Sequence, residues 1–346
     1  MRRKLIILFV LVTSCWCYGA TAFGKPAATL DIYFIDVEGG AATLIVTPAG
    51  ESLLIDTGFP GDRDAGRIAN VALNVAGLKQ IDHCLITHWH RDHVGGVPML
   101  AKLIPIKRYY DHGLPQTVAA DMQAEFIEAY KQETQEKSVT LRAGDQIKLR
   151  RSSTPVTVRV LAASGVVLGE QSSAPQVRPC GDNFEAKPED VTDNANSIGI
   201  LLNFGQFKFF DGGDLTWNVE HRLACPKNLV GRVDVYQVDH HGTDSSNNPA
   251  LVRSLSPRVA IIDSGPRKGA EVQTVSTLKS VSGRDSIYQL HRNLRTGDNE
   301  NAMSGYIANE DEACQGNFIK LSVDPNSRSY SVTIPAKQIT RRYQTR

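Results

Sequence analysis

The chain has 346 residues, of which 41% are hydrophobic and 22% charged, the balance of a globular protein that can bury a sizeable core. Its formal net charge of +1 gives no support for a large basic surface, so no specific nucleic-acid binding is predicted. No transmembrane segment is predicted either, because no apolar run approaches the roughly 20 residues that a bilayer requires.

The amino terminus has the pattern of an export signal. A positive segment (residues 2–4) precedes an unbroken apolar run (residues 5–12), and Ala20-Thr21-Ala22 offers a small-x-small cleavage site. We therefore predict a signal peptide over residues 1–22 and a periplasmic or extracellular protein. Two alternatives are lipoprotein anchoring through Cys15 and burial of the apolar run as a first strand.

Residues 29–335 are predicted to form one domain that begins with short strands. Runs rich in β-formers are broken by Gly39-Gly40 and by Pro48-Ala49-Gly50, which is typical of a meander. Apolar residues at helical spacing then continue to Gly77, a residue suited to ending a helix. Strands are expected at residues 30–37, 42–47, 52–56 and 81–86, and helices at residues 65–77, from Pro98 onward and at residues 119–134.

The second half returns to strands. Gly205-Gln206 and Asp324-Pro325-Asn326 are turn sequences that join two predicted hairpins. Residues 164–193 are rich in Ser, Pro, Gly and charge, and we expect a long surface loop there. Strand layers covered by helices predict an α+β or α/β sandwich. The further strands are expected at residues 139–141, 146–149, 156–161, 197–204, 207–210, 233–238, 258–262, 318–323 and 330–334, with a helix at residues 271–281.

The central chemical signal is the segment Thr87-His88-Trp89-His90-Arg91-Asp92-His93. It follows an apolar strand and precedes Gly95-Gly96, so its side chains are expected at a strand end that allows close backbone approach. Histidine with aspartate suits zinc, manganese or iron better than calcium or magnesium. The alternative is a solvated loop that happens to be rich in histidine. The predicted metal ligands in this segment are His88, His90, Asp92 and His93.

The H-x-H-x-D-H order after a short buried strand resembles the signature of the metallo-β-lactamase superfamily. Residues 54–58, 211–214 and 238–242 look like three further motifs of that family, in the family's order. The resemblance implies an αββα sandwich with two divalent metal ions at one edge between the sheets, zinc first and manganese or iron otherwise. It also implies a hydrolase that uses a metal-bridging hydroxide.

The resemblance further implies which residues hold the metals. His88 and His90 hold the first ion, whereas Asp92, His93 and a late histidine hold the second. Asp214 bridges both ions, so Asp92 and Asp214 are the predicted catalytic carboxylates.

Other residues are expected around these ligands. Asp56 is expected to position the ligands from behind. His240 is preferred as the late histidine because it comes first off its strand, and His241 is then a supporting or substrate-contacting residue. Asn196 and Thr243 are expected beside the substrate, with a polar loop as the alternative for Thr243.

One departure narrows the resemblance. Most hydrolases of the superfamily have another histidine before the bridging aspartate, but here only His112 lies between, and it follows the first cluster too soon. The expected region reads Asp193-Asn194-Ala195-Asn196-Ser197. This pattern, with Gly213-Asp214 and His240-His241-Gly242-Thr243, is similar to the domains of competence (DNA-uptake) proteins and of phosphorylcholine esterases. That similarity implies phosphodiester substrates and a first metal that is weakly held or completed by water.

Three functions are therefore weighed. The first is an exported hydrolase of phosphodiester or other small-molecule substrates, the second a β-lactam or lactone ring hydrolase, and the third a non-catalytic metal-binding module. Arg267-Lys268 is interpreted as a solvated pair that can add positive charge. Cys84 is expected to be a buried thiol, and Cys180 and Cys225 are expected to pair, with Cys314 as a competitor for either.

Overall fold

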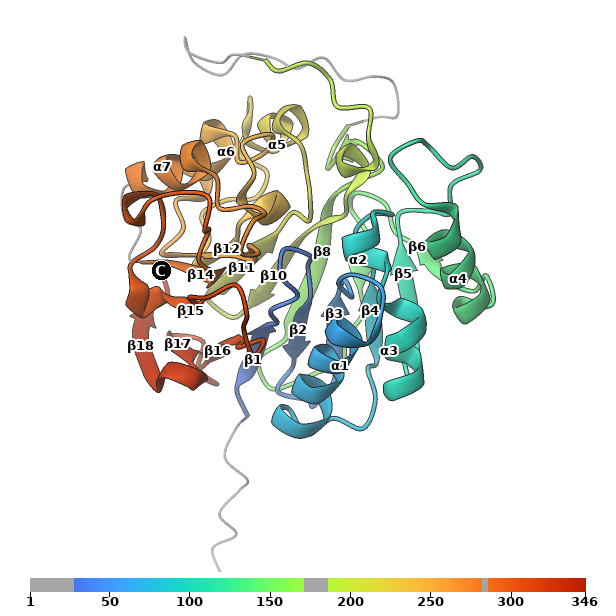
Figure 1. The fold of residues 1–346 in the computed structure, drawn as a ribbon, viewed down its shortest axis with the longest axis horizontal. Helices are drawn as coiled ribbons and strands as arrows, with labels where there is room; N and C mark the ends of the chain where they lie inside the picture. Colours follow the sequence, from blue (N-terminus) through green and yellow to red (C-terminus); the bar gives the residue numbers. More distant parts are fainter. Residues whose placement is uncertain (1–27, 171–185, 282–285) are drawn as a thin grey trace, which may run out of the picture.

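The computed structural model describes residues 28–170, 186–281 and 286–346. Two mixed sheets face each other, and helices cover the outer face of each (Figure 1). This arrangement confirms the predicted αββα sandwich. The predicted signal peptide lies outside the described residues, and within them no helix has the length and apolar character needed to span a membrane.

The first sheet carries the amino-terminal strands at its centre and a carboxyl-terminal hairpin at one edge. β1 pairs antiparallel with β2 and β16, whereas β3, β4 and β5 run parallel. Residues 339–344 form a last strand that pairs with the strand before it, so this sheet extends past residue 335, the predicted end of the domain. Its order is β18 (Ile339–Gln344), β17 (Ser329–Ile334), β16 (Ile319–Val323), β1 (Leu30–Phe34), β2 (Thr43–Val46), β3 (Ser52–Ile55), β4 (His83–Leu85), β5 (Tyr109–Asp111) and β6 (Val139–Thr140).

The second sheet is built around the predicted hairpin of β10 and β11. From β11 to β15 the strands are parallel, so their carboxyl ends meet at one edge of the sheet. Its order is β15 (Ile307–Asn309), β14 (Ser286–His291), β13 (Val259–Ile262), β12 (Val235–Gln237), β11 (Phe207–Asp211), β10 (Gly199–Phe204), β8 (Val156–Ala163) and β7 (Gln146–Ile147), and β9 (Val166–Val167) pairs with β8.

Helices cover the two outer faces. α1 buries Ala65 and Ile68 against Leu44 and Leu54 of the first sheet, which follows from its apolar stripe at helical spacing. This layer consists of α1 (Asp62–Asn70), continued by a π-helical turn (Val71–Val75), α2 (Arg91–Val94), α3 (Val97–Leu103) and α4 (Ala124–Thr134). The other layer consists of α5 (Trp217–Ala224), α6 (Pro249–Leu255) and α7 (Val272–Ser280). Short 3-10 turns occur at Asp193–Asn196, Asp239–Gly242, Asp298–Glu300, Ser304–Tyr306 and Pro335–Lys337.

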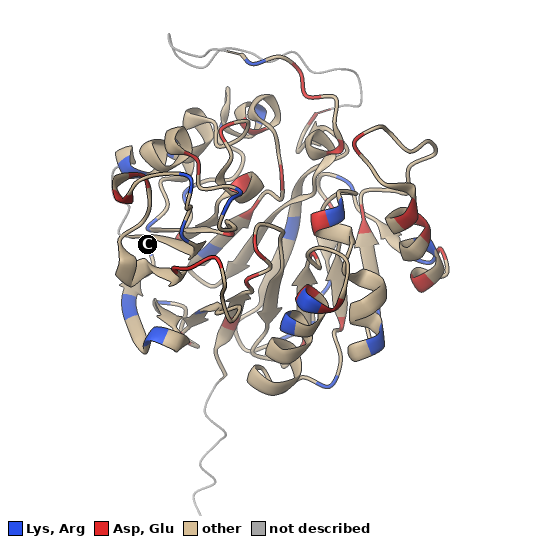
Figure 2. Ribbon diagram, viewed as in Figure 1, with Lys and Arg blue, Asp and Glu red and all other residues tan. Residues whose placement is uncertain are grey.

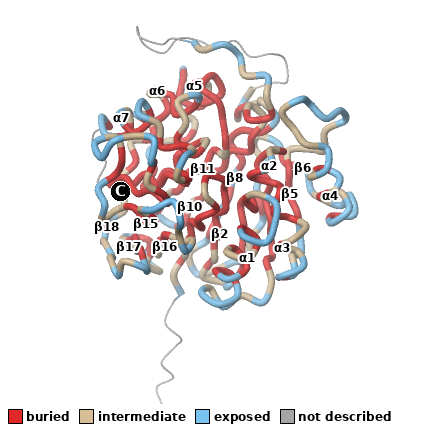
Figure 3. Tube along the Cα trace, viewed as in Figure 1, coloured by how far each residue is buried: buried red, intermediate tan, exposed pale blue. Residues whose placement is uncertain are grey.

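The main core lies between the two sheets, where buried residues concentrate (Figure 3). Phe34 of the first sheet and Phe209 of the second pack edge to face, with ring centroids 6.0 Å apart. Lysine, arginine, aspartate and glutamate are interspersed over the outside, in keeping with the small net charge (Figure 2). The two sheets therefore form a closely packed scaffold for the loops at the strand ends.

The cysteines differ in state. Cys84 is a buried free thiol, as predicted, and Cys314 is also free. Cys225 is disulfide-bonded. Cys180, its predicted partner, lies outside the described residues, as do residues 171–185 of the predicted surface loop at 164–193. The suggestion that Cys314 competes for a disulfide is therefore wrong.

Candidate metal centre

The predicted site residues gather where strands of the two sheets end side by side. Asp56 directly follows β3, the histidine segment follows β4, and Asp214 follows β11. Gly95 and Gly96 let the chain turn tightly here, because a Cβ at Gly96 would lie 2.0 Å from the Thr57 carbonyl oxygen. The sheet architecture thus brings together motifs that are more than 100 residues apart in the sequence.

His93 is held from behind by Asp56, as the resemblance implied. Asp56 Oδ2 lies 2.7 Å from His93 Nδ1, and Asp56 also accepts hydrogen bonds from the backbone N–H and hydroxyl of Thr87, at 2.8 and 2.7 Å. Asp56 has a left-handed backbone, with φ 60°, which is uncommon outside glycine. Because its Nδ1 is engaged by this carboxylate, His93 directs Nε2 into the site.

Asp214 lies at the middle of the cluster. Its Oδ2 is 3.3 Å from His93 Nε2, 3.8 Å from His88 Nε2, and 3.5 Å from Nε2 of both His240 and His241. Its backbone N–H donates to Ser197 Oγ at 3.2 Å, which anchors the loop after β11. This central position is the one expected of a carboxylate shared by two metals.

His241 belongs to a second group of ligand atoms, with Asp92 and His93. His241 Nε2 lies 3.4 Å from Asp92 Oδ2, and His93 Nε2 lies 3.7 Å from the same oxygen. The opposite nitrogen of His241, Nδ1, lies 3.3 Å from Asp263 Oδ2. The geometry therefore groups the second histidine of the pair, His241, with Asp92 and His93.

His240 is placed differently from His241. Its Nδ1 contacts the hydroxyls of Ser246 and Ser245 at 3.1 and 3.2 Å, and its side chain is 15% exposed, whereas that of His241 is 0% exposed. Both residues have left-handed backbones, with φ 53° and 55°. Two such residues in succession cost of order 1 kcal/mol or more each, and this strain aims the two rings in different directions.

His90 lies beside the cluster without joining either group of converging atoms. Its ring centroid is 4.6 Å from that of His88, but its Nε2 contacts Asp121 Oδ2 at 2.9 Å. His88 itself is completely buried, with Nδ1 3.1 Å from the Thr87 hydroxyl and Nε2 facing Asp214. The first-metal side of the site is thus less completely assembled than the second.

Asp193 occupies the region where a middle histidine was sought. Its Oδ2 accepts hydrogen bonds from the Trp89 backbone N–H at 2.6 Å and from His112 Nε2 at 3.1 Å. Asn196 Nδ2 donates to Asp193 Oδ1 at 3.0 Å, so Asn196 supports this loop. His112 therefore has a structural partner, and the loop braces the backbone of the histidine segment.

Lys268 reaches the site, contrary to its interpretation as a solvated residue. Its ammonium contacts Asp92 Oδ2, and its side chain is 38% exposed. The neighbouring Arg267 does behave as a surface residue, pairing with the exposed Glu312 at 2.7 Å. Thr243, expected beside the substrate, hydrogen-bonds the Ser245 hydroxyl at 3.0 Å.

The donor set fits divalent metal ions. Within the described residues, Nε2 of His88, His93 and His241 is buried and has no hydrogen-bond partner. Such atoms are costly to bury unless a ligand or proton satisfies them. Imidazole nitrogens facing carboxylate oxygens are a ligand set for zinc, manganese or iron.

The electrostatics of the site also favour a cation. Burial lowers the pKa of His88 well below its usual range, so its imidazole is neutral and has a lone pair to share. Burial acts in the same direction on His93, but Asp214, Asp56 and Asp92 outweigh it and raise the pKa of His93 to about 10. The carboxylates thus create a negative potential strong enough to hold a proton where a metal ion would bind.

Three acidic residues of the site were missed at the sequence level. Asp121 lies outside the helices and strands, Asp193 begins a 3-10 turn, and no spacing relates either residue to the histidines. Asp263 could have been found, because it directly follows the apolar β13 strand next to the strand that precedes His241.

Residues 35–159 match the family model described as the metallo-beta-lactamase superfamily. An atrochrysone carboxyl ACP thioesterase of Cryptosporiopsis sp. is 43% identical over 75 residues, 21% of this chain and 23% of that protein. ComE operon protein 3 of Bacillus subtilis is 22% identical over 193 residues, 56% of this chain and 21% of that protein. The chain thus matches only about a fifth of the length of these relatives.

Two solved structures are similar to this chain at low sequence identity. Igni18, a metallo hydrolase of Ignicoccus hospitalis, is 12% identical with a TM-score of 0.44, covering 75% of this chain and 94% of that one. The metallo-beta-lactamase SMB-1 is 14% identical with a TM-score of 0.38, covering 67% of this chain and 83% of that one.

Proposed function

We propose that the chain is a hydrolase that uses two divalent metal ions, because residues 35–159 match the model of the metallo-β-lactamase superfamily. The observation that carries this proposal is the convergence of three buried imidazole nitrogens on two carboxylates. Those nitrogens have no hydrogen-bond partner among the described residues, and each lies within 3.3–3.8 Å of a carboxylate oxygen. The residues concerned are His88, His93, His241, Asp92 and Asp214.

We assign the ligands as follows. The first ion would be held by His88, His90 and Asp214, and the second by Asp92, His93 and His241, with Asp214 shared between them. His241 replaces His240 in this assignment because its Nε2 lies within the group that includes Asp92 and His93. Zinc is the preferred metal for this nitrogen-rich set, with manganese or iron as alternatives.

Two ions bound in these positions would lower the pKa of a water molecule towards ~7 and polarise the scissile bond of the substrate. The protein's own part is to hold the ligand side chains in the orientation in which they bind the ions. Asp56 hydrogen-bonds Nδ1 of His93, and Asp263 Oδ2 lies 3.3 Å from Nδ1 of His241. His240 is partly exposed and anchored by two serine hydroxyls, and we assign it to substrate contact.

Phosphodiesters are the substrate class that we propose. The first-metal side has no middle histidine, and His112, the histidine nearest in the sequence to that role, hydrogen-bonds Asp193 instead. The likeness to ComE operon protein 3 extends over 56% of this chain, longer than the thioesterase match. The ammonium of Lys268 at Asp92 adds a positive charge beside the centre, which suits an anionic phosphate.

Carboxylic thioesters are the second candidate, because the match at 43% identity over 75 residues is to a thioesterase. Lactone and β-lactam rings involve the same attack on an acyl carbon and stay with this alternative. The remaining alternative is a non-catalytic metal-binding module. It would lack hydrolysis of any substrate while still binding metal.

A substrate panel tests the proposal. Zinc- or manganese-loaded protein is assayed with bis(p-nitrophenyl) phosphate, an acyl thioester of N-acetylcysteamine, nitrocefin and a homoserine lactone. We expect turnover of the phosphodiester that is lost in Asp214→Ala, which should also hold fewer than two ions in this centre, and kept in Asp62→Ala, an exposed aspartate on α1. Turnover of the thioester alone would show that the substrates are thioesters and not phosphodiesters. If the metal-loaded protein turns over none of the four substrates, the proposal that it is a hydrolase is refuted.

We also propose that the protein is exported and acts in the periplasm or outside the cell. The sequence pattern of residues 1–22 supports this location. A disulfide at Cys225 is in keeping with an oxidising compartment, since such bonds are rare in the cytosol.

A further inference from the structure

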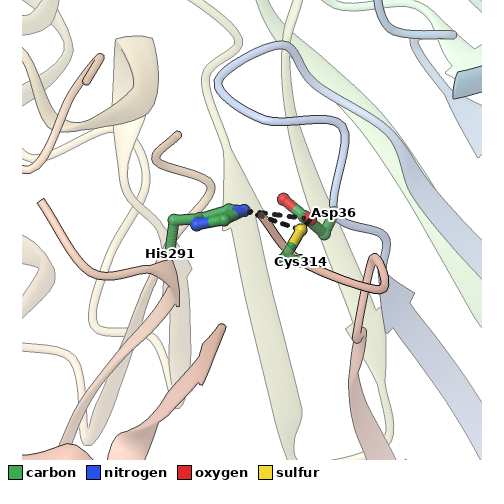
Figure 4. Close-up of side chains that lie close together, drawn as sticks. All are labelled: Asp36, His291 and Cys314. Carbon is green, nitrogen blue, oxygen red and sulfur yellow. Dashed lines mark hydrogen bonds and ion pairs between the residues drawn. The ribbon is translucent and has the colours of Figure 1, made fainter. Parts of the chain in front are cut away.

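A second cluster of metal-ligand atoms lies apart from the residues assigned to hydrolysis. It consists of Asp36, which follows β1, His291 at the end of β14, and Cys314 in the segment between β15 and β16. Figure 4 shows the three side chains pointing toward one another from these three segments. The cluster therefore joins both sheets and the connection that leads back into the first sheet.

The three donor atoms are almost equally spaced. His291 Nε2 lies 3.2 Å from Asp36 Oδ2 and 3.3 Å from Cys314 Sγ, and Cys314 Sγ lies 3.2 Å from Asp36 Oδ2 (Figure 4). Donors bound to a tetrahedral zinc ion at about 2.0–2.3 Å are roughly 3.3–3.6 Å apart. The triangle is thus close to one face of a zinc tetrahedron.

The arrangement differs from that of a nucleophilic triad. In a triad, the acid and the nucleophile contact opposite nitrogens of the histidine, so that one orients the ring and the other gives up its proton. Here Asp36 and Cys314 both contact Nε2 of His291. A carboxylate, an imidazole and a thiol that meet at one point are suited to coordination.

The cluster is deeply placed and incompletely satisfied. Asp36 and His291 are both 0% exposed, and Nδ1 of His291 has no hydrogen-bond partner among the described residues. Cys314 is a free thiol that is partly exposed, which leaves a route for an ion to enter. Nδ1 is the ring nitrogen opposite the cluster, so the case for an ion rests on Nε2, which meets both Asp36 and Cys314.

The surrounding charges leave room for a divalent cation. Arg67 contacts Asp36 Oδ2 at 3.2 Å and Glu38 Oε1 at 2.9 Å. Glu38 Oε1 also lies 3.8 Å from Cys314 Sγ, near enough to approach a fourth coordination position. Asp36, Glu38 and a deprotonated Cys314 carry three negative charges, against the two positive charges of Arg67 and of Arg63, which pairs with Glu38 Oε2 at 2.6 Å. A divalent ion that displaces the Cys314 proton would offset the remaining negative charge.

We propose that Asp36, His291 and Cys314 bind a third divalent metal ion, zinc by preference. The ion would clamp the end of β1 to the end of β14 and to the connection before β16. It would share no residue with the hydrolytic centre. It would also differ from that centre in having a sulfur ligand, which sets it apart spectroscopically.

Cobalt substitution tests the proposal directly. Metal-free protein is titrated with Co²⁺, and thiolate-to-cobalt charge-transfer absorption is followed in the near ultraviolet. We expect the band in the native chain, in Asp214→Ala and in Cys84→Ala, which removes the other free thiol of the described residues, a fully buried one. We expect Cys314→Ser to lose the band and one equivalent of bound metal. No band in the native chain, or a band that survives Cys314→Ser, would overturn the site.

A measurement on the unaltered chain guards against a variant that fails to fold. The rate at which a thiol reagent modifies Cys314 is compared in metal-free and zinc-loaded protein, and the modified residue is identified by peptide mapping. We expect zinc to slow the reaction at least tenfold, and His291→Gln to remove that protection. Equal rates with and without zinc would refute the site. Neither readout depends on hydrolysis, so both remain valid whatever the substrate panel shows.

Discussion

Asp56 Oδ2 lies 2.7 Å from Nδ1 of His93, and this contact decides where the opposite nitrogen of His93 points. An ionised carboxylate only accepts hydrogen bonds, so a proton is on Nδ1, and Nε2 is the nitrogen that faces Asp214 and Asp92 and can exchange its own proton for a metal ion. The carboxylate that sets the ring is itself held by the backbone and hydroxyl of Thr87.

Asp56→Asn should therefore weaken metal binding while the ligands remain in place. An amide offers His93 a less favourable partner, and loss of such outer contacts costs about 10–100-fold in affinity. Competition with a chelator, followed by metal analysis, measures the change. Asp62→Asn, on the exposed face of α1, is the matched control. Unchanged affinity in Asp56→Asn would show that His93 needs no support from Asp56.

His241→Ala and His240→Ala should have different effects. His241 is fully buried among Asp92 and Asp214, so its loss should leave fewer than two ions in the hydrolytic centre. His240→Ala should keep its metal and lower turnover, because His240 is anchored by serine hydroxyls at the edge of the centre. Metal content and kcat, measured on both variants, decide between the two. The reverse pattern would restore His240 as the ligand.

Lys268→Ala should impair catalysis on an anionic substrate. The ammonium of Lys268 lies at Asp92, beside the centre. A charge-assisted hydrogen bond from it to a substrate phosphate would be worth about 1.5–3 kcal/mol, or roughly 10–100-fold in kcat/KM. Arg267→Ala is the control, since Arg267 pairs with Glu312 on the surface. If both variants hydrolyse bis(p-nitrophenyl) phosphate at the native rate, Lys268 has no part in recognising the phosphate.

Asp211→Asn should change how stability depends on pH. Burial, together with the charges of Asp56 and Asp263, raises the pKa of Asp211 from 3.8 to about 8. Because the folded value lies above the unfolded one, this group's contribution to stability is complete below about pH 4. It is then lost as the pH rises to about 8, at up to about 1.4 kcal/mol per pH unit.

Urea unfolding of metal-free protein between about pH 5 and pH 8 tests this sign. The native chain should lose stability relative to Asp211→Asn as the pH rises, because the amide carries no charge to bury. The substituted side chain can still accept the hydrogen bond that Gly213 N–H donates to Asp211 Oδ1 at 2.9 Å. Parallel stability curves for the two proteins would contradict the raised pKa.

Deletion of residues 1–22 should keep the protein in the cytoplasm. The positive segment and apolar run of the amino terminus are the features that an export machinery recognises. Fractionation of cells expressing the full and shortened chains measures the effect, and a cytoplasmic marker enzyme controls for leakage. Undiminished periplasmic or extracellular product from the shortened chain would refute the signal.

Local patterns predicted much of the fold. The hairpin of β10 and β11 was expected because apolar runs flank the turn residues Gly205-Gln206. The conformation of such a turn depends only on nearby residues. α5 and β14 were missed for a common reason. All six residues of β14 are buried, including Gln289 and His291, and α5 buries Asn218, Glu220 and His221. Elements surrounded by protein lose the polar face on which periodicity arguments depend.

The sequence by itself determined the chemistry of the centre: the histidine segment, Asp56, Asp214 and the late histidine pair. Only the tertiary structure decided how these groups are used. Which of His240 and His241 faces Asp92 depends on two left-handed backbone conformations, and Lys268 reaches Asp92 only because the loop after β13 folds over it. The cluster of Asp36, His291 and Cys314 joins positions that are up to 278 residues apart. No local pattern relates such residues, since their proximity is produced by the packing of two sheets.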